Sequence, residues 1–224
     1  NPTGRVWNKG ELDEIASICK DYNLMLVADE IHADFVFQGK HQVFANLKKE
    51  YAEWTITCTS PGKTFNLAGL QTSNIFIPNQ KLKNAFKKQL DAAGYSQLNA
   101  AGLVACEAAY RDGEEWYQTM KKYVADNIAF TKEFVEKNLP GVNMVEHEGT
   151  YLIWLDFNGL GLCTQELEDL IVHKAKLWLD SGRIFGKCGR GFQRINVACP
   201  RSTLKEALER IAKVLPADTV KFAS

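Results

Sequence analysis

A short, uninterrupted apolar run that stops at an acid is the feature that most limits the folds open to this chain. Residues 24–28, Leu-Met-Leu-Val-Ala, are followed directly by Asp29. A run this short, without polar alternation, predicts a strand buried on both faces, as in a parallel sheet. Asn8, with Glu11 three residues later, is typical of a helix start, and apolar residues recur at helical spacing to about residue 22. Helix followed by buried strand predicts an α/β fold.

Similar alternation continues beyond this first unit. Two more strands are expected, at residues 54–59 and 72–77, and three more helices, at residues 79–93, 97–110 and 114–138. After the Pro-Gly pair at 140–141 the pattern changes to shorter segments: strands at 142–145, 151–157, 178–179 and 192–197, and helices at 164–176 and 202–215, the last capped by Ser202. We therefore expect two domains, residues 1–118 and 119–224.

Composition excludes several classes of protein. The 224 residues carry 27 Lys and Arg against 27 Asp and Glu, so the formal net charge is zero and no basic face for nucleic acid or a membrane surface is expected. No apolar run is long enough to span a bilayer. The six cysteines are irregularly spaced, which predicts reduced thiols in a cytoplasmic protein rather than disulfides. The four histidines form no metal-binding pattern, so no metal site is expected.

Two polar loops follow predicted parallel strands, at the sheet edge where open α/β sheets bind ligands. Asp29 ends the first strand, and Lys63 lies just beyond the second. A pyridoxal phosphate (PLP) site needs such a pair, because a lysine amine forms a Schiff base with the cofactor and an acid pairs with the protonated pyridine nitrogen. On spacing alone, two ordinary surface charges are the more common explanation of this pair.

The local sequences are more specific than the spacing. Four motifs occur in order, at residues 1–4, 29–35, 60–70 and 191–201. Together they resemble the class I/II aminotransferase superfamily (fold type I), and within it the PatB/MalY-like cystathionine β-lyases. The resemblance runs over the whole chain. It implies an α/β fold in which residues 1–118 are the C-terminal part of a PLP-binding large domain, with a mostly parallel sheet and flanking helices, and residues 119–224 are a smaller α+β domain.

The resemblance also implies roles for individual residues around the cofactor. Lys63 would form the Schiff base and then, as general base, remove the Cα proton of the substrate. Asp29 would pair with the pyridine nitrogen, and Asn1 would hydrogen-bond the ring hydroxyl oxygen. His32 stands where aminotransferases commonly carry a tyrosine that contacts the same oxygen. A histidine at this position resembles the β-lyase branch of the family. A buried structural histidine is the alternative at this position.

At the two ends of the ligand, the resemblance implies that Ser60 contacts the cofactor phosphate and that Arg194 binds the substrate α-carboxylate. Two positions depart from the family pattern. Gln71 stands where many relatives have a phosphate-binding arginine, and Gly62 stands where a serine often precedes the lysine. Both changes remove phosphate contacts, so other groups are expected to hold that end of the cofactor.

The implied function is a PLP-dependent carbon–sulfur β-lyase that releases a thiol, pyruvate and ammonia from an amino acid such as cystathionine. An aminotransferase that uses the same residues is the alternative. The family implies a homodimer with small-molecule substrates, and neither nucleic acid nor membrane is an expected partner. Because the sequence starts at Asn1, within the family pattern, we expect a C-terminal fragment, and an inactive fragment is a further alternative.

Overall fold

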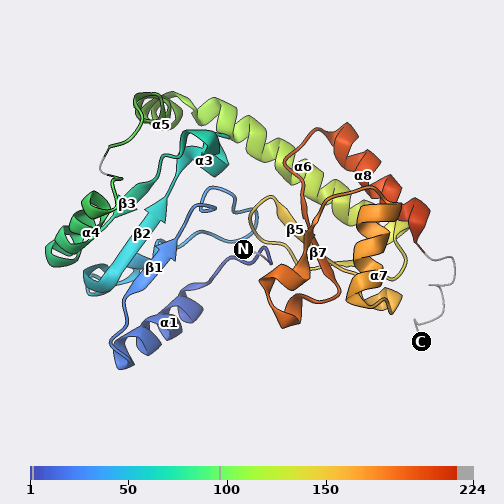
Figure 1. Ribbon diagram of the computed structural model, residues 1–224, viewed down its shortest axis with the longest axis horizontal. Helices are drawn as coiled ribbons and strands as arrows, with labels where there is room; N and C mark the ends of the chain where they lie inside the picture. The colour runs from blue at the N-terminus through green and yellow to red at the C-terminus, as the bar shows by residue number, and fades with distance from the viewer. Residues whose placement is uncertain (2, 96, 216–224) are drawn as a thin grey trace. The chain divides into compact units, whose positions relative to one another are not determined.

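Two sheets with their own helices make up the part of the chain that the computed structural model describes, residues 1, 3–95 and 97–215 (Figure 1). The chain divides into two compact units. One, the N-unit, is Val6–Thr119; the other, the C-unit, combines Asn1–Arg5 with Met120–Ser224. The first five residues thus belong with the C-terminal part of the chain. None of the described helices is both long and apolar enough to cross a membrane.

The N-unit is built on a three-stranded sheet in the order β1-β2-β3, with β1 Leu26–Asp29, β2 Thr55–Thr59 and β3 Asn74–Phe76. β1 and β2 are parallel, as expected, whereas β3 is antiparallel to β2. The carboxyl ends of β1 and β2 therefore meet at one edge of the sheet, where Asp29 lies opposite Cys58.

One face of β1 is buried and the other is exposed. Leu26 and Ala28 pack against a core that includes Leu12, Ala16, Phe44 and Tyr51. Val27, which points to the opposite face, is 58% exposed. The expectation of a strand covered on both faces is wrong for the described residues, because α1 (Lys9–Asp21) and its neighbours cover a single face of this strand.

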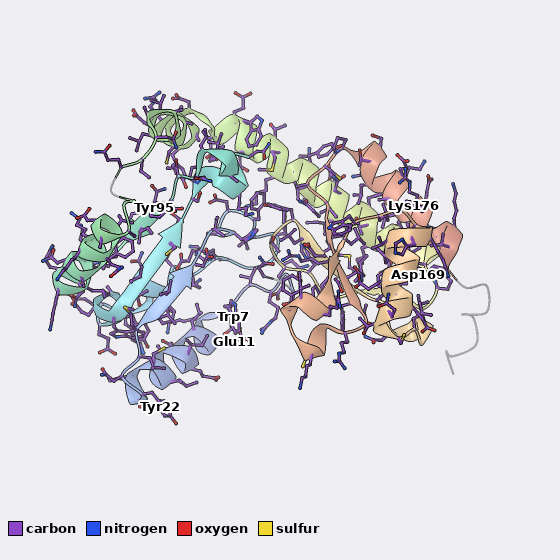
Figure 2. The ribbon with its side chains drawn as sticks, in the orientation of Figure 1. Trp7, Glu11, Tyr22, Tyr95, Asp169 and Lys176 are labelled. Atoms are coloured by element: carbon purple, nitrogen blue, oxygen red, sulfur yellow. The ribbon has the colours of Figure 1, made fainter. Side chains whose placement is uncertain are left out.

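The helices of the N-unit begin where side chains can cap them. α1, Lys9–Asp21, starts with the expected capping box: Asn8 Oδ1 accepts the N–H of Glu11 at 3.1 Å, and the Glu11 carboxylate accepts the N–H of Asn8 at 3.0 Å. Figure 2 shows Glu11 near the start of α1 and Tyr22 at its end. The other helical segments are α2 Phe44–Leu47, η1 Tyr51–Trp54, α3 Pro61–Thr64, η2 Ala68–Leu70, α4 Gln80–Ala92 and α5 Ala100–Asp112. The long helix α6 spans Glu114–Asn138, as expected.

The C-unit is built on an antiparallel sheet in the order β4-β5-β7-β6. Its strands are β4 Asn143–Met144, β5 Leu152–Asp156, β6 Asp180–Ser181 and β7 Phe192–Asn196. Its helical segments after α6 are η3 Asn158–Leu160, α7 Thr164–Glu168, η4 Asp169–Lys174, η5 Gly182–Phe185, η6 Lys187–Gly189 and α8 Arg201–Val214. Ile153 and Leu155 of β5 and Leu204, Leu208 and Ile211 of α8 are fully buried, which places the core of this unit on the sheet.

Two helices of the C-unit differ from expectation. The helix expected over 164–176 is α-helical only to Glu168 and continues as a π-helix to Lys174; Figure 2 marks this region by Asp169 and Lys176. The last helix is capped at Pro200 rather than Ser202, without a side-chain cap. The N–H of Arg201 instead donates to the hydroxyl of Tyr123, which supplies the acceptor that a capping side chain would have given.

The carbonyl group of Gly4 connects the first residues of the chain to the later part of the C-unit. Gly4 O accepts the N–H groups of Glu148 and Gly149 at 2.8 and 2.9 Å. Gly4 has a φ of +78°, and a Cβ at this position would overlap the ring of the buried His147. His147 Nε2 lies 2.8 Å from the carbonyl oxygen of Thr150. A glycine is therefore required both by the backbone conformation and by the space available.

Candidate active site

The shared edge of β1 and β2 places an acid and a lysine in neighbouring loops. The N–H of Glu30 donates to the carbonyl oxygen of Cys58 at 2.9 Å, so the parallel pairing continues one residue beyond β1. Asp29 is exposed, and its Oδ1 accepts the N–H of Ile31 at 3.2 Å. Among the described residues, its Oδ2 has no hydrogen-bond partner. One carboxylate oxygen therefore faces solvent at the end of β1.

Lys63 lies in α3, which is fixed at its start by Ser60. The Ser60 hydroxyl oxygen accepts the N–H of Gly62 at 2.9 Å and donates to the carbonyl oxygen of Thr72 at 2.7 Å. Lys63 itself is exposed, whereas Gly62 and Thr64 on either side of it are buried. The lysine amine is thus presented to solvent from a short, well-anchored helix.

The far end of α3 is anchored from another direction. Thr64 Oγ1 donates to the Asp34 carboxylate, and the Tyr117 hydroxyl donates to the carbonyl oxygen of Asp34 at 2.7 Å. The loop after β1 and the helix that carries Lys63 are therefore held together by Asp34. Asp34 is not among the cofactor- and substrate-binding residues expected from the sequence.

The two departures from the family pattern have local explanations. A Cβ on Gly62 would lie 3.0 Å from Ser60 Oγ and 3.2 Å from Ala68 Cα, so a serine would crowd the cap that starts α3. Gln71 adopts a left-handed conformation with φ +53° and closes the turn η2, and its side chain is exposed.

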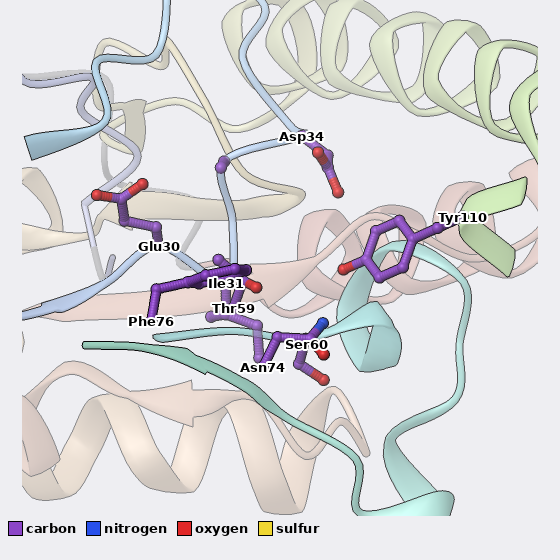
Figure 3. Close-up of a pocket in the computed structure, with 9 residues that line it drawn as sticks. Glu30, Ile31, Asp34, Thr59, Ser60, Asn74, Phe76 and Tyr110 are labelled. Carbon is purple, nitrogen blue, oxygen red and sulfur yellow. The ribbon is translucent and has the colours of Figure 1, made fainter. Parts of the chain in front are cut away.

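A pocket of about 420 Å³ opens beside this edge of the N-unit (Figure 3). It is lined by Glu30, Ile31, Ala33, Asp34, Thr59, Ser60, Asn74, Phe76 and Tyr110. Figure 3 shows Tyr110 reaching in from α5 with its hydroxyl turned toward the pocket. Burial, and then the charge of Asp34, raise the pKa of Tyr110, so its phenol is neutral at physiological pH. His32 lies in the turn after β1 and is partly buried.

The thiol nearest the acid is also neutral. Burial raises the pKa of Cys58, and the negative charge of Asp29 raises it further. Because a thiol is nucleophilic only as thiolate, Cys58 is a poor candidate for covalent chemistry. Of Cys58 and Lys63, the lysine therefore remains the candidate nucleophile at this edge.

The remaining two expected residues lie together in the C-unit. Arg194 Nη1 donates to Asn1 Oδ1 at 2.7 Å, although the two residues are 193 positions apart. The same guanidinium donates to Asp180 Oδ2 through Nε at 3.0 Å and through Nη2 at 2.6 Å. Its carbon Cζ lies 4.6 Å from the centre of the Phe185 ring. Asp180 and Phe185 were not expected from the sequence.

The six expected residues thus fall into two groups. Asp29, His32, Ser60 and Lys63 belong to the N-unit, and Asn1 and Arg194 belong to the C-unit. The first group fits PLP in its chemistry, because an exposed amine and a carboxylate with one oxygen open are what the aldehyde and the protonated pyridine require. Ser60 fits less simply, since its hydroxyl hydrogen is already donated to Thr72.

Comparison with known proteins agrees with this chemistry. The sequence profile of the family "Aminotransferase class I and II" matches residues 1–211, so the chain belongs to that family. The chain is 38% identical to cystathionine β-lyase PatB of Bacillus subtilis over 216 residues, 96% of this chain and 56% of PatB. The expected similarity to the PatB/MalY-like lyases is confirmed.

Solved structures and more distant relatives extend the comparison. Cystalysin from Treponema denticola, whose crystal structure contains a pyridoxal 5'-phosphate cofactor, matches with a TM-score of 0.93 and 42% identity over 96% of this chain and 55% of its own. An aspartate aminotransferase of Pyrococcus horikoshii is 29% identical over 223 residues, 96% of this chain and 54% of that protein. The expected α/β fold is confirmed, and the chain spans about half the length of these relatives.

Proposed function

We propose that this protein is a PLP-dependent carbon–sulfur β-lyase that acts on an amino acid of the cystathionine type. The observation that carries the proposal is the pairing of β1 and β2, which brings exposed Asp29 and exposed Lys63 to one edge of a parallel pair of strands. The similarity to the cystathionine β-lyase PatB favours a lyase among the enzymes that share this edge. Cystathionine or a related cysteine thioether would be the substrate, and a thiol, pyruvate and ammonia the products.

Each residue has a defined task in this reaction. Bound PLP supplies a protonated pyridine ring that takes up the electron pair left at the substrate Cα. Asp29, through its open oxygen, would hold the proton on the pyridine nitrogen. The Lys63 amine would hold the cofactor and then remove the Cα proton. Asn1 and His32 would serve the ring hydroxyl oxygen.

Arg194 would bind the α-carboxylate of the substrate. After the Cα proton is removed, the Cβ–S bond of the substrate breaks. The electron pair of that bond goes to sulfur, which leaves as a thiol after taking a proton. The remaining three-carbon fragment takes up water and gives pyruvate and ammonia. Ser60 would approach the cofactor phosphate, at the cost of its hydrogen bond to Thr72.

Domain roles, assembly and location are part of the same proposal. Residues 1–118 would be the C-terminal part of the PLP-binding large domain and residues 119–224 the small domain, with residues 1–5 attached to the latter unit. The enzyme would work as a homodimer. All six cysteines are free, which favours the reducing cytoplasm. Light scattering on the purified protein tests the dimer.

The decisive experiment incubates the full-length protein, loaded with PLP, with cystathionine and no keto acid. We expect pyruvate and free thiol, and none from Lys63→Ala. Lys49→Ala, which removes an exposed lysine of a loop, is the control and should keep full activity. Keto-acid production that requires an added keto-acid acceptor would replace the lyase with an aminotransferase, the alternative favoured by the similarity to the Pyrococcus enzyme.

A second experiment tests the alternative that this stretch is inactive by itself, which its span of about half the relatives' length favours. PLP is added to the 224-residue chain and the visible absorbance of lysine-bound cofactor is recorded. Absorbance that is lost in Lys63→Ala shows that these residues bind the cofactor by themselves. A colourless chain would mean that cofactor binding needs the rest of a longer protein.

A further inference from the structure

Arg194 is held by three elements of the C-unit. In the sheet register, Asp180 of β6 and Trp154 of β5 are its direct neighbours on either side. Trp154 packs edge-on against Phe185 and stacks on Phe192, with ring centroids 5.4 Å apart in each pair. Phe185 in turn lies under the guanidinium. The arginine thus rests on an aromatic platform and is flanked by one carboxylate.

The hydrogen bonds of Arg194 leave a specific part of the guanidinium open. A guanidinium has five N–H donors, and two of its edges present a parallel pair: Nε with Nη2, and Nη1 with Nη2. Asp180 takes the Nε/Nη2 edge with a single oxygen, and Asn1 takes one N–H of Nη1. Among described residues, one N–H on Nη1 and one on Nη2 remain without an acceptor. Because Asp180 occupies the Nε/Nη2 edge, the Nη1/Nη2 edge is the parallel pair that it leaves for a further carboxylate.

The burial of the two partners shows which of them depends on the pair. The Arg194 side chain is 14% exposed, whereas that of Asp180 is 45% exposed. Asp180 could be solvated without a partner, but the arginine is largely removed from water and needs its acceptors. Asp180 therefore does more for the position of Arg194 than Arg194 does for Asp180.

We propose that Asp180 is a positioning residue that fixes Arg194 so that its Nη1/Nη2 edge meets the α-carboxylate of the amino-acid substrate. This inference rests on the proposed function, which assigns the carboxylate to Arg194. It adds which edge of the arginine binds and which residue dictates that edge. Asp180 acts through hydrogen-bond geometry, although its negative charge by itself opposes the binding of an anion.

Geometry and charge predict different variant series. Asp180→Asn keeps an acceptor oxygen for Nε and Nη2 and removes the charge, so a carboxylate should bind at least as tightly as in the wild type. Asp180→Ala removes the acceptor, and the guanidinium is then free to turn away from the substrate. We expect Asp180→Ala to bind the carboxylate on the order of tenfold more weakly than Asp180→Asn.

The test measures binding separately from turnover. Full-length protein loaded with PLP is titrated with L-norleucine, which carries no sulfur leaving group, and with L-norleucinamide, which lacks the carboxylate. Both dissociation constants are read from cofactor absorbance. The constant for norleucinamide divided by the constant for norleucine reports the carboxylate contact alone. Asp180→Asn should keep this ratio, and Asp180→Ala should lower it by about tenfold. Glu206→Ala, which takes a carboxylate from the exposed Arg210, is the matched control and should leave it unchanged.

Two further measurements fix what each result means. Arg194→Ala should remove the preference for norleucine over norleucinamide that this ratio reports. If the preference remains, the proposed carboxylate role of Arg194 is wrong. If Arg194→Ala removes this preference but Asp180→Ala and Asp180→Asn give the same ratio, Asp180 is not a positioning residue. If the ratios of the three variants change as expected but cystathionine gives no pyruvate, the lyase proposal fails and the role of Asp180 stands.

Kinetics and folding provide the last controls. The grip on the carboxylate is the same before and during the chemical step, so Asp180→Ala should raise KM and leave kcat nearly unchanged. Melting temperatures identify any misfolded variant. Asp180→Ser, whose hydroxyl is too short to reach both nitrogens, replaces Asp180→Ala if alanine prevents folding, and the same fall in the ratio is expected.

Discussion

Ser60 has one hydroxyl hydrogen, and the hydrogen bond to the carbonyl oxygen of Thr72 uses it. The same oxygen accepts the N–H of Gly62 and starts the helix that carries Lys63. A phosphate oxygen needs a donor, so a contact with phosphate would require the hydroxyl to turn away from Thr72. The residue thus has a structural task that competes with the cofactor contact the family resemblance implies.

Ser60→Ala separates these two tasks. Loss of the cap should lower the free energy of unfolding by about 0.5–2 kcal/mol in urea denaturation without cofactor. If the cap is its main task, PLP should raise the melting temperature of wild type and variant by equal amounts. A smaller rise in the variant would instead establish a contact between Ser60 and the phosphate.

His147 is a buried histidine that sequence patterns did not single out. Burial lowers its pKa, an effect that outweighs the opposing hydrogen bond with the Thr150 carbonyl. The unfolded chain therefore takes up a proton at this residue more readily than the folded chain does. The stability that neutral His147 contributes is fully present above its unfolded pKa of about 6.5 and is lost as the pH falls below it.

His147→Gln tests this pH dependence, because glutamine can keep a hydrogen bond to Thr150 but does not titrate. Between pH 7 and pH 5, wild type should lose more stability in urea denaturation than the variant does. Parallel curves for the two proteins over this range would mean that His147 does not couple folding to pH.

At the scale of elements, the boundaries predicted from the sequence are right where contacts between nearby residues set them. α6 spans the expected residues, and the cap of α1 involves Asn8 and Glu11 as expected. The π-helix over Asp169–Lys174 was missed, because apolar spacing predicts helix but does not distinguish α from π winding. The exposed face of β1 was missed for another reason: the burial of a strand depends on which elements cover it.

The candidate site divides along the same line. Asp29 and Lys63 were predictable because each directly follows a recognisable strand, and parallel pairing then brings them to one edge. Asp180 was not, because its partner Arg194 lies across the β6–β7 pairing, and nothing in the sequence fixes that register. Asn1 and Arg194 were each expected from the family resemblance, but their hydrogen bond depends on long-range folding.

The cap of α1 gives a prediction at the scale of one helix. Asn8→Ala removes the acceptor for the N–H of Glu11 and should lower the free energy of unfolding by about 1 kcal/mol. Asn8→Ser retains a capping oxygen and should lose much less. Circular dichroism during urea denaturation measures both. Equal losses in the two variants would contradict a capping role for Asn8.

For the whole molecule, the notable feature is that the chain starts in the C-unit, continues through the N-unit and returns. The two N–H groups that Gly4 O accepts, from Glu148 and Gly149, connect the start of the chain to the later part. A disturbance at Gly4 should therefore be felt more than a hundred residues away in sequence, and less in the adjacent residues of α1.

Gly4→Ala tests this by hydrogen exchange. The added methyl group would meet His147, so the amides of Glu148 and Gly149 should exchange faster, while those of β1 should not change. Gly39→Ala is a matched control, because Gly39 has a similar φ of +77° but open space around it. Exchange that accelerates around Gly4 alone, and not at 148–149, would contradict the connection.

The hydrogen bond between Asn1 and Arg194 has a consequence for how the protein is made. Its partners are 193 positions apart, so Asn1 leaves the ribosome long before Arg194 is synthesised. At about 5–20 residues per second the interval is roughly 10–40 s. During that time the strands of the N-unit are synthesised, whereas the sheet that contains Arg194 is not yet available to bind Asn1. The arginine proposed to bind the substrate carboxylate therefore meets Asn1 only after the whole N-unit has been synthesised.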